Sequence, residues 1–148
     1  MYNNDHIQIK GDIAITVYDS DGNIKFTKEE TNLVLTAGKN FVAAKLANSS
    51  VAISQIAIGS GTTAPAPDQT ALSAIIGAKK AISTITSTNN VTSITASFSG
   101  TSYAASSVTE AGLFLNDGGS TMICRTTFGS FAILSTDTIG FVWNLTIV

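Results

Sequence analysis

Residues 139–148 read IGFVWNLTIV, and this stretch carries the clearest secondary-structure signal of the sequence. Large apolar side chains alternate there with smaller or more polar ones, which is the two-residue period of a β-strand. The heavier face consists of Ile139, Phe141, Trp143, Leu145 and Ile147. One heavy and one light face are typical of a sheet that packs on one side against a second sheet. The stretch therefore predicts a half-buried strand of a β-sandwich.

Upstream of this strand, further segments have strand character and are separated by turn residues. They lie near residues 52–58, 78–88, 91–100, 108–115 and 120–129. Asn89-Asn90 and the run from Asn116 to Gly119 are typical of hairpin turns, because Asn, Asp and Gly tolerate the backbone angles that such turns need. Short antiparallel strands at this spacing indicate a mainly β domain.

Residues 7–28 predict an N-terminal β-hairpin. Apolar residues alternate on both sides of Asp21-Gly22, a dipeptide that favours tight turns. We expect residues 1–30 to form an N-terminal arm or hairpin that projects from a β-sandwich of residues 31–148. The length of 148 residues suits a single domain overall.

One short helix is predicted in the N-terminal half, over about residues 37–47. Its apolar face would comprise Ala37, Phe41, Val42, Ala44 and Leu46. Thr36 is the expected N-cap, and residues 48–50 would end the helix. The predicted fold is an antiparallel β-sandwich with this helix and the N-terminal hairpin.

The composition excludes several classes of protein. Charged residues make up only 12% of the chain and hydrophobic residues 44%, while 17 Ser and 20 Thr account for a quarter of it. Low charge with ordinary hydrophobicity argues against disorder. A net charge of −2 argues against nucleic-acid binding through a basic face, and a single cysteine excludes a disulfide within the chain.

A membrane location is not expected either. The uncharged stretch Ala81–Thr109 has 29 residues, but fifteen of them are Ser or Thr, so it would insert poorly into a bilayer. The N-terminus lacks a basic segment followed by an apolar run, and we therefore expect no signal peptide.

Residues able to perform catalysis are scarce. His6 is the only histidine and belongs to a polar N-terminal segment, so a nucleophile–histidine pair is not expected. Cys124 alternates with Met122 and Phe128 on the presumed core face, which favours a buried structural cysteine. We predict that the protein is not an enzyme and needs no cofactor.

Two loops resemble ligand-binding motifs only in part. Asp19, Asp21, Asn23 and Glu30 match positions 1, 3, 5 and 12 of a calcium-binding loop, but Ile24 stands where that loop needs glycine. Gly59-Ser60-Gly61 resembles a phosphate-binding loop, but no lysine lies between Lys45 and Lys79. We expect ordinary turns at both places and no metal site.

Glu110 and Arg125 are the charged pair that the sequence singles out. Arg125 is the only arginine, and Glu110 is the only acidic residue between Asp68 and Asp117. The two lie on consecutive strands joined by the turn at residues 116–119, so a hairpin brings them close together. We expect a structural ion pair, within the subunit or at a subunit interface.

An ordered set of segments resembles a family of small structural proteins of tailed bacteriophages. The segments are IAIGSGTTAP (56–65), DQTAL (68–72), TEAGLF (109–114), MICRTTF (122–128) and WNLTI (143–147). Members of that family tend to carry an IGxGTTAP…DTAL loop, an EAGLF strand, a strand with Met and Arg at this spacing, and a terminal strand beginning with Trp. The resemblance covers about residues 31–148. Gln69 departs from the usual residue before Thr70.

The resemblance implies a virion protein that is assembled in the host bacterial cytoplasm. The first expectation is a capsid decoration (cement) protein, a homo-oligomer and most readily a trimer, that binds the major capsid protein and stabilises the head. Residues 1–28 would then be the arm that grips a neighbour by strand addition. The alternative is a tail adaptor or fibre-base protein that contacts tail or fibre proteins, and a carbohydrate-binding β-sandwich is the third possibility.

Overall fold

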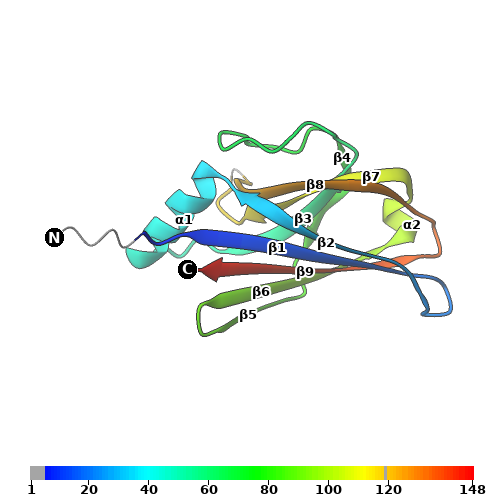
Figure 1. The fold of residues 1–148 in the computed structure, drawn as a ribbon, viewed down its shortest axis with the longest axis horizontal. Coiled ribbons are helices and arrows are strands. Elements are labelled where there is room, and N and C mark those ends of the chain that lie inside the picture. Colours follow the sequence, from blue (N-terminus) through cyan, green and yellow to red (C-terminus); the bar gives the residue numbers. More distant parts are fainter. Residues whose placement is uncertain (1–5, 119) are drawn as a thin grey trace.

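The computed structural model describes residues 6–118 and 120–148, which form nine strands and two helices (Figure 1). Predictions that concern Met1 to Asp5 and Gly119 lie outside the described residues. The elements are β1 (Ile9–Tyr18), β2 (Ile24–Val34), α1 (Thr36–Leu46), β3 (Ile53–Gly59), β4 (Ile75–Ala81), β5 (Thr84–Thr88), β6 (Val91–Ser99), α2 (Gly100–Tyr103), β7 (Ala105–Leu115), β8 (Met122–Ile133) and β9 (Thr138–Ile147).

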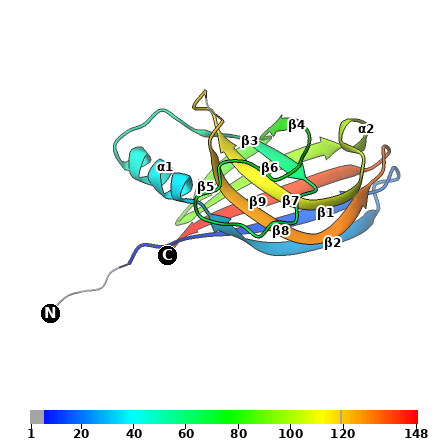
Figure 2. The same cartoon turned by 90° about the horizontal axis from the view of Figure 1, so that it is seen from above.

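The strands form one antiparallel sheet in the order β4-β3-β7-β8-β2-β1-β9-β6-β5. This sheet curls so that its two halves face each other, as the view from above in Figure 2 shows. We call the half with β1, β9, β6, β5 and most of β2 sheet A, and the half with β4, β3, β7 and β8 sheet B. The prediction of a mainly β, antiparallel sandwich is confirmed.

Strand β2 joins the two halves. It pairs with β1 from Ile24 to Asn32, and only its last residues, Leu33 and Val34, pair with β8. The sandwich is therefore closed on one side by a strand that passes from sheet A to sheet B.

The first three residues of the heavy face of β9 lie in the core between the sheets, whereas Leu145 is half-buried and Ile147 is exposed at the end of the strand. Phe141 and Trp143 are at most 1% exposed, and Ile13 and Ile15 of the neighbouring β1 are buried beside them. The indole Nε1 of Trp143 donates a hydrogen bond of 2.8 Å to Oδ1 of Asn32, which gives the buried ring its polar partner. The alternation in residues 139–148 thus identified the core strand.

The N-terminal hairpin is present, but it does not project from the body. β1 lies between β2 and β9 and pairs with β9 along its whole length, from Ile9 to Tyr18. Every second residue of β1 contributes to the core, so separating the hairpin would expose that core. The expectation of a projecting arm at residues 1–30 is wrong for residues 9–30, and only the turn around Asp21-Gly22 extends beyond the sheet.

Helix α1 begins at Thr36, close to the predicted start, but Thr36 is not its cap. Leu35 is the N-cap residue, and no side chain caps the helix. The predicted apolar face is covered only in part, because Phe41 is half-buried whereas Ala44 and Leu46 are exposed, Leu46 to 86%.

The contact between α1 and the sheet depends on a small residue. Gly38 is the buried residue of the helix, and a Cβ atom there would lie 2.5 Å from the carbonyl oxygen of Ile123 in β8. A helix that approaches through glycine packs its backbone on the strand and leaves its larger side chains at the rim. Neither helix in the described part of the chain is long and apolar enough to cross a membrane.

Two further details differ from the predictions. The segment expected as one strand at residues 78–88 is two strands, β4 and β5, which belong to different halves of the sandwich. In the β7–β8 ladder the register shifts between Leu113 and Phe114. This shift separates Met122 from Cys124: Cys124 faces the core between the sheets, whereas Met122 packs in a second apolar cluster with Phe114.

Candidate functional site

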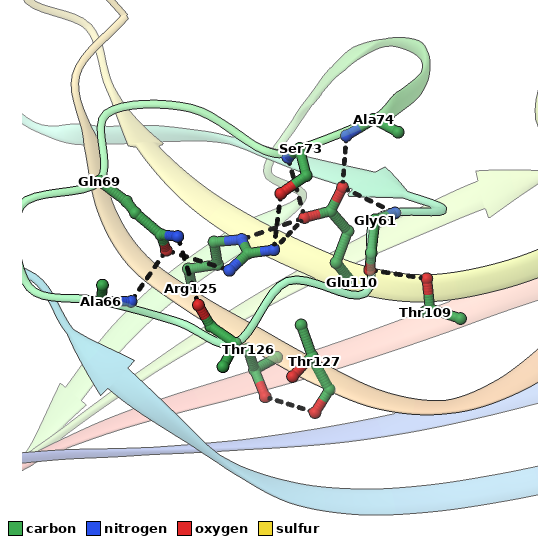
Figure 3. Close-up of polar contacts among 11 residues, drawn as sticks. Gly61, Ala66, Gln69, Ser73, Ala74, Thr109, Glu110, Arg125, Thr126 and Thr127 are labelled. Carbon is green, nitrogen blue, oxygen red and sulfur yellow. Dashed lines mark hydrogen bonds and ion pairs between the residues drawn. The ribbon is translucent and has the colours of Figure 1, made fainter.

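Glu110 and Arg125 form an ion pair on the face of sheet B that points away from sheet A. Glu110 stands opposite Thr127 and Arg125 stands opposite Gly112 in the β7–β8 ladder, so the two are diagonal neighbours. Nη2 of Arg125 lies 2.7 Å from Oε2 of Glu110, and both side chains are fully buried. A loop of the same chain, residues 60–74, covers them, so no second subunit is needed to bury the pair (Figure 3).

The loop is held by the carboxylate of Glu110, and we call residues 60–74 the clamped loop. Oε1 accepts hydrogen bonds from the backbone N–H groups of Gly61 (3.0 Å) and Ala74 (2.8 Å). Oε2 accepts a third from the N–H of Ser73 at 3.1 Å. One side chain thus fixes both ends of the loop against β7.

Arg125 holds the middle of the clamped loop. Its Nη1 donates to Oε1 of Gln69 at 3.0 Å, and its Nη2 donates to Oγ of Ser73 at 3.1 Å. Oε1 of Gln69 also accepts the backbone N–H of Ala66, so the side chain links the guanidinium to the loop backbone (Figure 3). Gln69 therefore faces Arg125.

The pKa of Glu110 reflects two opposing effects. Burial by itself would raise it, but the backbone N–H of Ala74 and the guanidinium of Arg125, with the N–H groups of Ser73 and Gly61, lower the pKa below its ordinary value. The carboxylate is therefore ionised at neutral pH, as a partner of a buried guanidinium must be.

The glycines of Gly59-Ser60-Gly61 are explained by the same carboxylate. A Cβ atom on Gly59 or on Gly61 would lie 2.5 Å from Oε1 of Glu110. Any larger residue would push the loop away from its hydrogen-bond acceptor. The motif that resembles a phosphate-binding loop accommodates a carboxylate of its own chain.

This network leaves Glu110 no capacity for acid–base work. Its two oxygens already accept five hydrogen bonds, two from Arg125 and three from the loop backbone. A general acid or base must exchange its proton with a substrate, and a fully buried and fully bonded carboxylate does not reach one. Sequence reasoning identified the pair but missed Gln69 and Ser73. Gln69 lies within the segment DQTAL (68–72), and Ser73 follows it directly.

The other residues considered from the sequence lie apart from this pair. Cys124 is fully buried in the core, where desolvation raises the pKa of its thiol to about 12, and such a thiol is a poor nucleophile. His6 is exposed ahead of β1. Oδ1 of Asp19 accepts the backbone N–H groups of Asp21 and Asn23, so this carboxylate organises the hairpin turn. The N–H of Asn23 is the main cause of its lowered pKa.

Metal ligation finds no support in the described ranges. Among residues 6–118 and 120–148, no group of three or more His, Cys, Asp or Glu side chains is placed to hold a metal ion.

The outer face of sheet A has a uniform chemistry over its last three strands. The registers place the outward residues of β5, β6 and β9 side by side, and none of them is fully buried. We call this the β5–β6–β9 face; it consists of Thr84, Thr86, Thr88, Val91, Ser93, Thr95, Ser97, Ser99, Thr138, Gly140, Val142, Asn144 and Thr146. It contains no charged residue, and charge begins only in β1, with Lys10 and Asp12.

A largely apolar groove of about 390 Å³ lies on the inner side of these strands, next to α1, and Lys45 is the charged residue in its lining. Phe41 and Leu46 of α1 line one side, and Ile85 of β5 and Ile147 of β9 line another. Leu46, Ile85 and Ile147 are 86%, 47% and 45% exposed, so this end of the sandwich presents apolar side chains to the solvent.

Comparisons of the chain with protein-family models, with curated proteins and with solved structures found no match.

Proposed function

We propose that this protein is a virion structural protein of a tailed bacteriophage, and that it decorates the outside of the capsid by binding the major capsid protein. The observation that carries the proposal is the uncharged β5–β6–β9 face, which has thirteen outward residues and no Lys, Arg, Asp or Glu. Hydroxyl groups and small side chains lose less on desolvation than charged groups do, so such a face can be covered by another protein at low cost. The resemblance of residues 31–148 supports the same assignment.

A decoration protein must also keep its shape while many weak contacts act together. The buried ion pair and the clamped loop stiffen sheet B, and the core strand β9 forms the centre of sheet A. Both features favour a rigid module whose contacts with a particle are made by fixed strand faces.

A tail adaptor or fibre-base protein is the second candidate, because the same neutral face can serve a contact with tail proteins. A carbohydrate-binding sandwich has less support: Trp143 and Phe141, the aromatic residues of β9, are buried in the core and cannot stack on a sugar ring.

The number of copies in purified virions separates the first two functions. If the protein decorates the head, its amount by quantitative mass spectrometry is comparable to that of the major capsid protein. An adaptor gives only the few copies that the symmetry of a tail allows, and absence from virions contradicts both functions.

The role of the face is tested by adding purified protein to particles that lack it. We expect Ser97→Lys, at an exposed position of the β5–β6–β9 face, to weaken binding at least tenfold. Ser106→Lys, at an exposed serine of β7 in sheet B, is the matched control and should bind like the wild type. Equal binding by both variants would show that this face does not contact the particle.

A further inference from the structure

The strand order leaves two edges, β4 and β5, and they are protected differently. β4 has the features of a guarded edge: its ladder with β3 shifts register between Ile56 and Ile58, Gly77 has a φ of +64°, and two lysines follow at positions 79 and 80. Bends and lysines of this kind keep an edge from pairing with another strand.

β5 lacks these protections. Residues 84–88 read TITST, with neither charge nor proline, and all five are exposed. They pair with β6 in an unbroken register from Thr84 to Thr88. Because hydrogen-bonded pairs alternate along an antiparallel ladder, every second residue of β5 turns its N–H and C=O groups away from β6. These groups are a regular template for one more strand.

The apolar groove lies directly beside this edge. Ile85 belongs both to β5 and to the lining of the groove, and Leu46 of α1 belongs to the same lining. A strand added to β5 would extend sheet A past the groove and would cover part of this exposed apolar surface. Edge and groove are therefore parts of one interaction surface.

We propose that β5 pairs with β5 of a second copy of this chain, antiparallel and about a two-fold axis. The sequence of the strand argues for this partner, because TITST is compatible with itself: with Thr86 at the axis, Thr84 faces Thr88 of the partner subunit and Ile85 faces its Ser87. The strand contains no charged residue, so pairing it with a second copy of itself brings no like charges together in any register. Ile85 lines the groove and is the neighbour of Thr86, so the two copies also bring the Ile85 sides of their grooves toward the axis.

The proposed dimer interface needs apolar surface from the groove in addition to the paired strands, because the strands alone bury too little area. Five residues span only about 17 Å, and a stable interface buries roughly 1,200–2,000 Å². Strand pairing alone falls short of this area, so Leu46 and Ile85 contribute apolar surface. The arrangement gives a dimer, where the resemblance favours a trimer. It does not depend on the proposed virion function.

The test uses the mass of the purified chain in solution, measured by light scattering at micromolar concentration. The wild type should have twice the mass of the 15.3 kDa chain. Thr86→Lys and Thr86→Glu each place like charges across the two-fold axis and should give monomers. A mixture of the two variants places Lys opposite Glu and should restore the dimer.

Two controls make the result specific. Thr138→Lys introduces the same charge at an exposed position of the same face but on β9, away from the edge, and should remain dimeric. Leu46→Glu changes the groove without touching β5 and should raise the dissociation constant at least tenfold. The proposal is overturned if the wild type is a monomer or a trimer, if Thr138→Lys acts like Thr86→Lys, or if the mixed variants stay monomeric.

Discussion

Oε1 of Glu110 accepts two hydrogen bonds and Oε2 accepts three, so both oxygens of the carboxylate are fully hydrogen-bonded. Arg125 likewise donates to Glu110, Gln69 and Ser73. Two buried charges are tolerated only when they are paired and fully bonded, because each loses its hydration. The stability of sheet B therefore depends on both residues being present.

Removing Arg125 should be strongly destabilising. Arg125→Met leaves Glu110 as a buried charge without its counter-ion, and we expect the free energy of unfolding to fall by about 3–5 kcal/mol. Urea denaturation followed by the fluorescence of Trp143, the only tryptophan, measures this change.

The matched control for Arg125→Met is Lys28→Met. Lys28 pairs with Glu30 at 3.1 Å, but each side chain of this pair is about one-third exposed. A pair of that kind contributes about 0–1 kcal/mol. Equal losses for the two variants would contradict the structural role of the Glu110–Arg125 pair.

The same carboxylates predict how stability depends on pH. The pKa of Glu110 is lowered, and the pKa of Asp137 is lowered chiefly by its hydrogen bond from Nζ of Lys25. A group whose pKa is lower in the folded state stabilises the fold above its ordinary pKa, which is 4.5 for Glu110, and this stabilisation is lost as the pH falls through the folded-state value. We expect the urea concentration at the unfolding midpoint to stay constant from pH 7 to about 5 and to decrease below about pH 5.

Glu110→Gln provides the comparison for this pH dependence. The variant should be less stable than the wild type at pH 7 but should lose less stability between pH 5 and pH 3, because one titrating carboxylate is gone. A wild-type midpoint that does not change down to pH 3 would contradict the lowered pKa values.

At the scale of the elements, α1 shows how tertiary contact overrides local preference. The sequence indicated its position well, but its apolar residues suggested a buried face that the structure covers only in part: Phe41 is half-buried, whereas Leu46 is exposed. The decisive residue is Gly38, which periodicity counts as neutral and which sets the distance between helix and strand. Burial of a helix through its backbone leaves no hydrophobic pattern in the sequence.

Gly38→Ala tests this contact, because helix propensity and the contact with β8 change the stability in opposite directions. Helix propensity alone would make the variant more stable by about 1 kcal/mol. The added Cβ would lie 2.5 Å from the carbonyl oxygen of Ile123, which belongs to a strand and cannot move easily. We therefore expect a loss of about 1–3 kcal/mol, measured by thermal or urea unfolding, with Asn40→Ala on the exposed side of the helix as control. An increase in stability would show that α1 is not seated as described.

The sequence also could not predict that residues 78–88 are divided between two strands, β4 and β5. Both halves have strand character, and the bend at Ile82-Ser83 contains neither proline nor glycine. What separates the two strands is their choice of partner, since β4 pairs with β3 and β5 pairs with β6. Pairing between distant segments is decided by the whole sheet, and local propensity carries little information about it.

At the scale of the whole molecule, the alternation of residues 139–148 predicted the sandwich and its core strand. It could not predict that β1 lies next to β9, or that β2 crosses from one half to the other at Leu33. For the candidate site, consecutive strands and scarce charges were enough to place Glu110 near Arg125. The clamped loop was missed because its bonds to Glu110 come from backbone N–H groups, which every residue except proline possesses.

The start of β1 lies beside the end of β9. The N–H of Gln8 donates to the carbonyl of Val148, and the N–H of Val148 donates to the carbonyl of Gln8, both at 2.8 Å. Ile9 and Ile147, which follow and precede these residues, line the groove beside α1. An affinity tag or a fluorescent protein fused after Val148 therefore begins next to the groove and can obstruct it. A label for binding or assembly experiments is better inserted between Asp21 and Gly22, in the hairpin at the opposite end of the molecule (Figure 1).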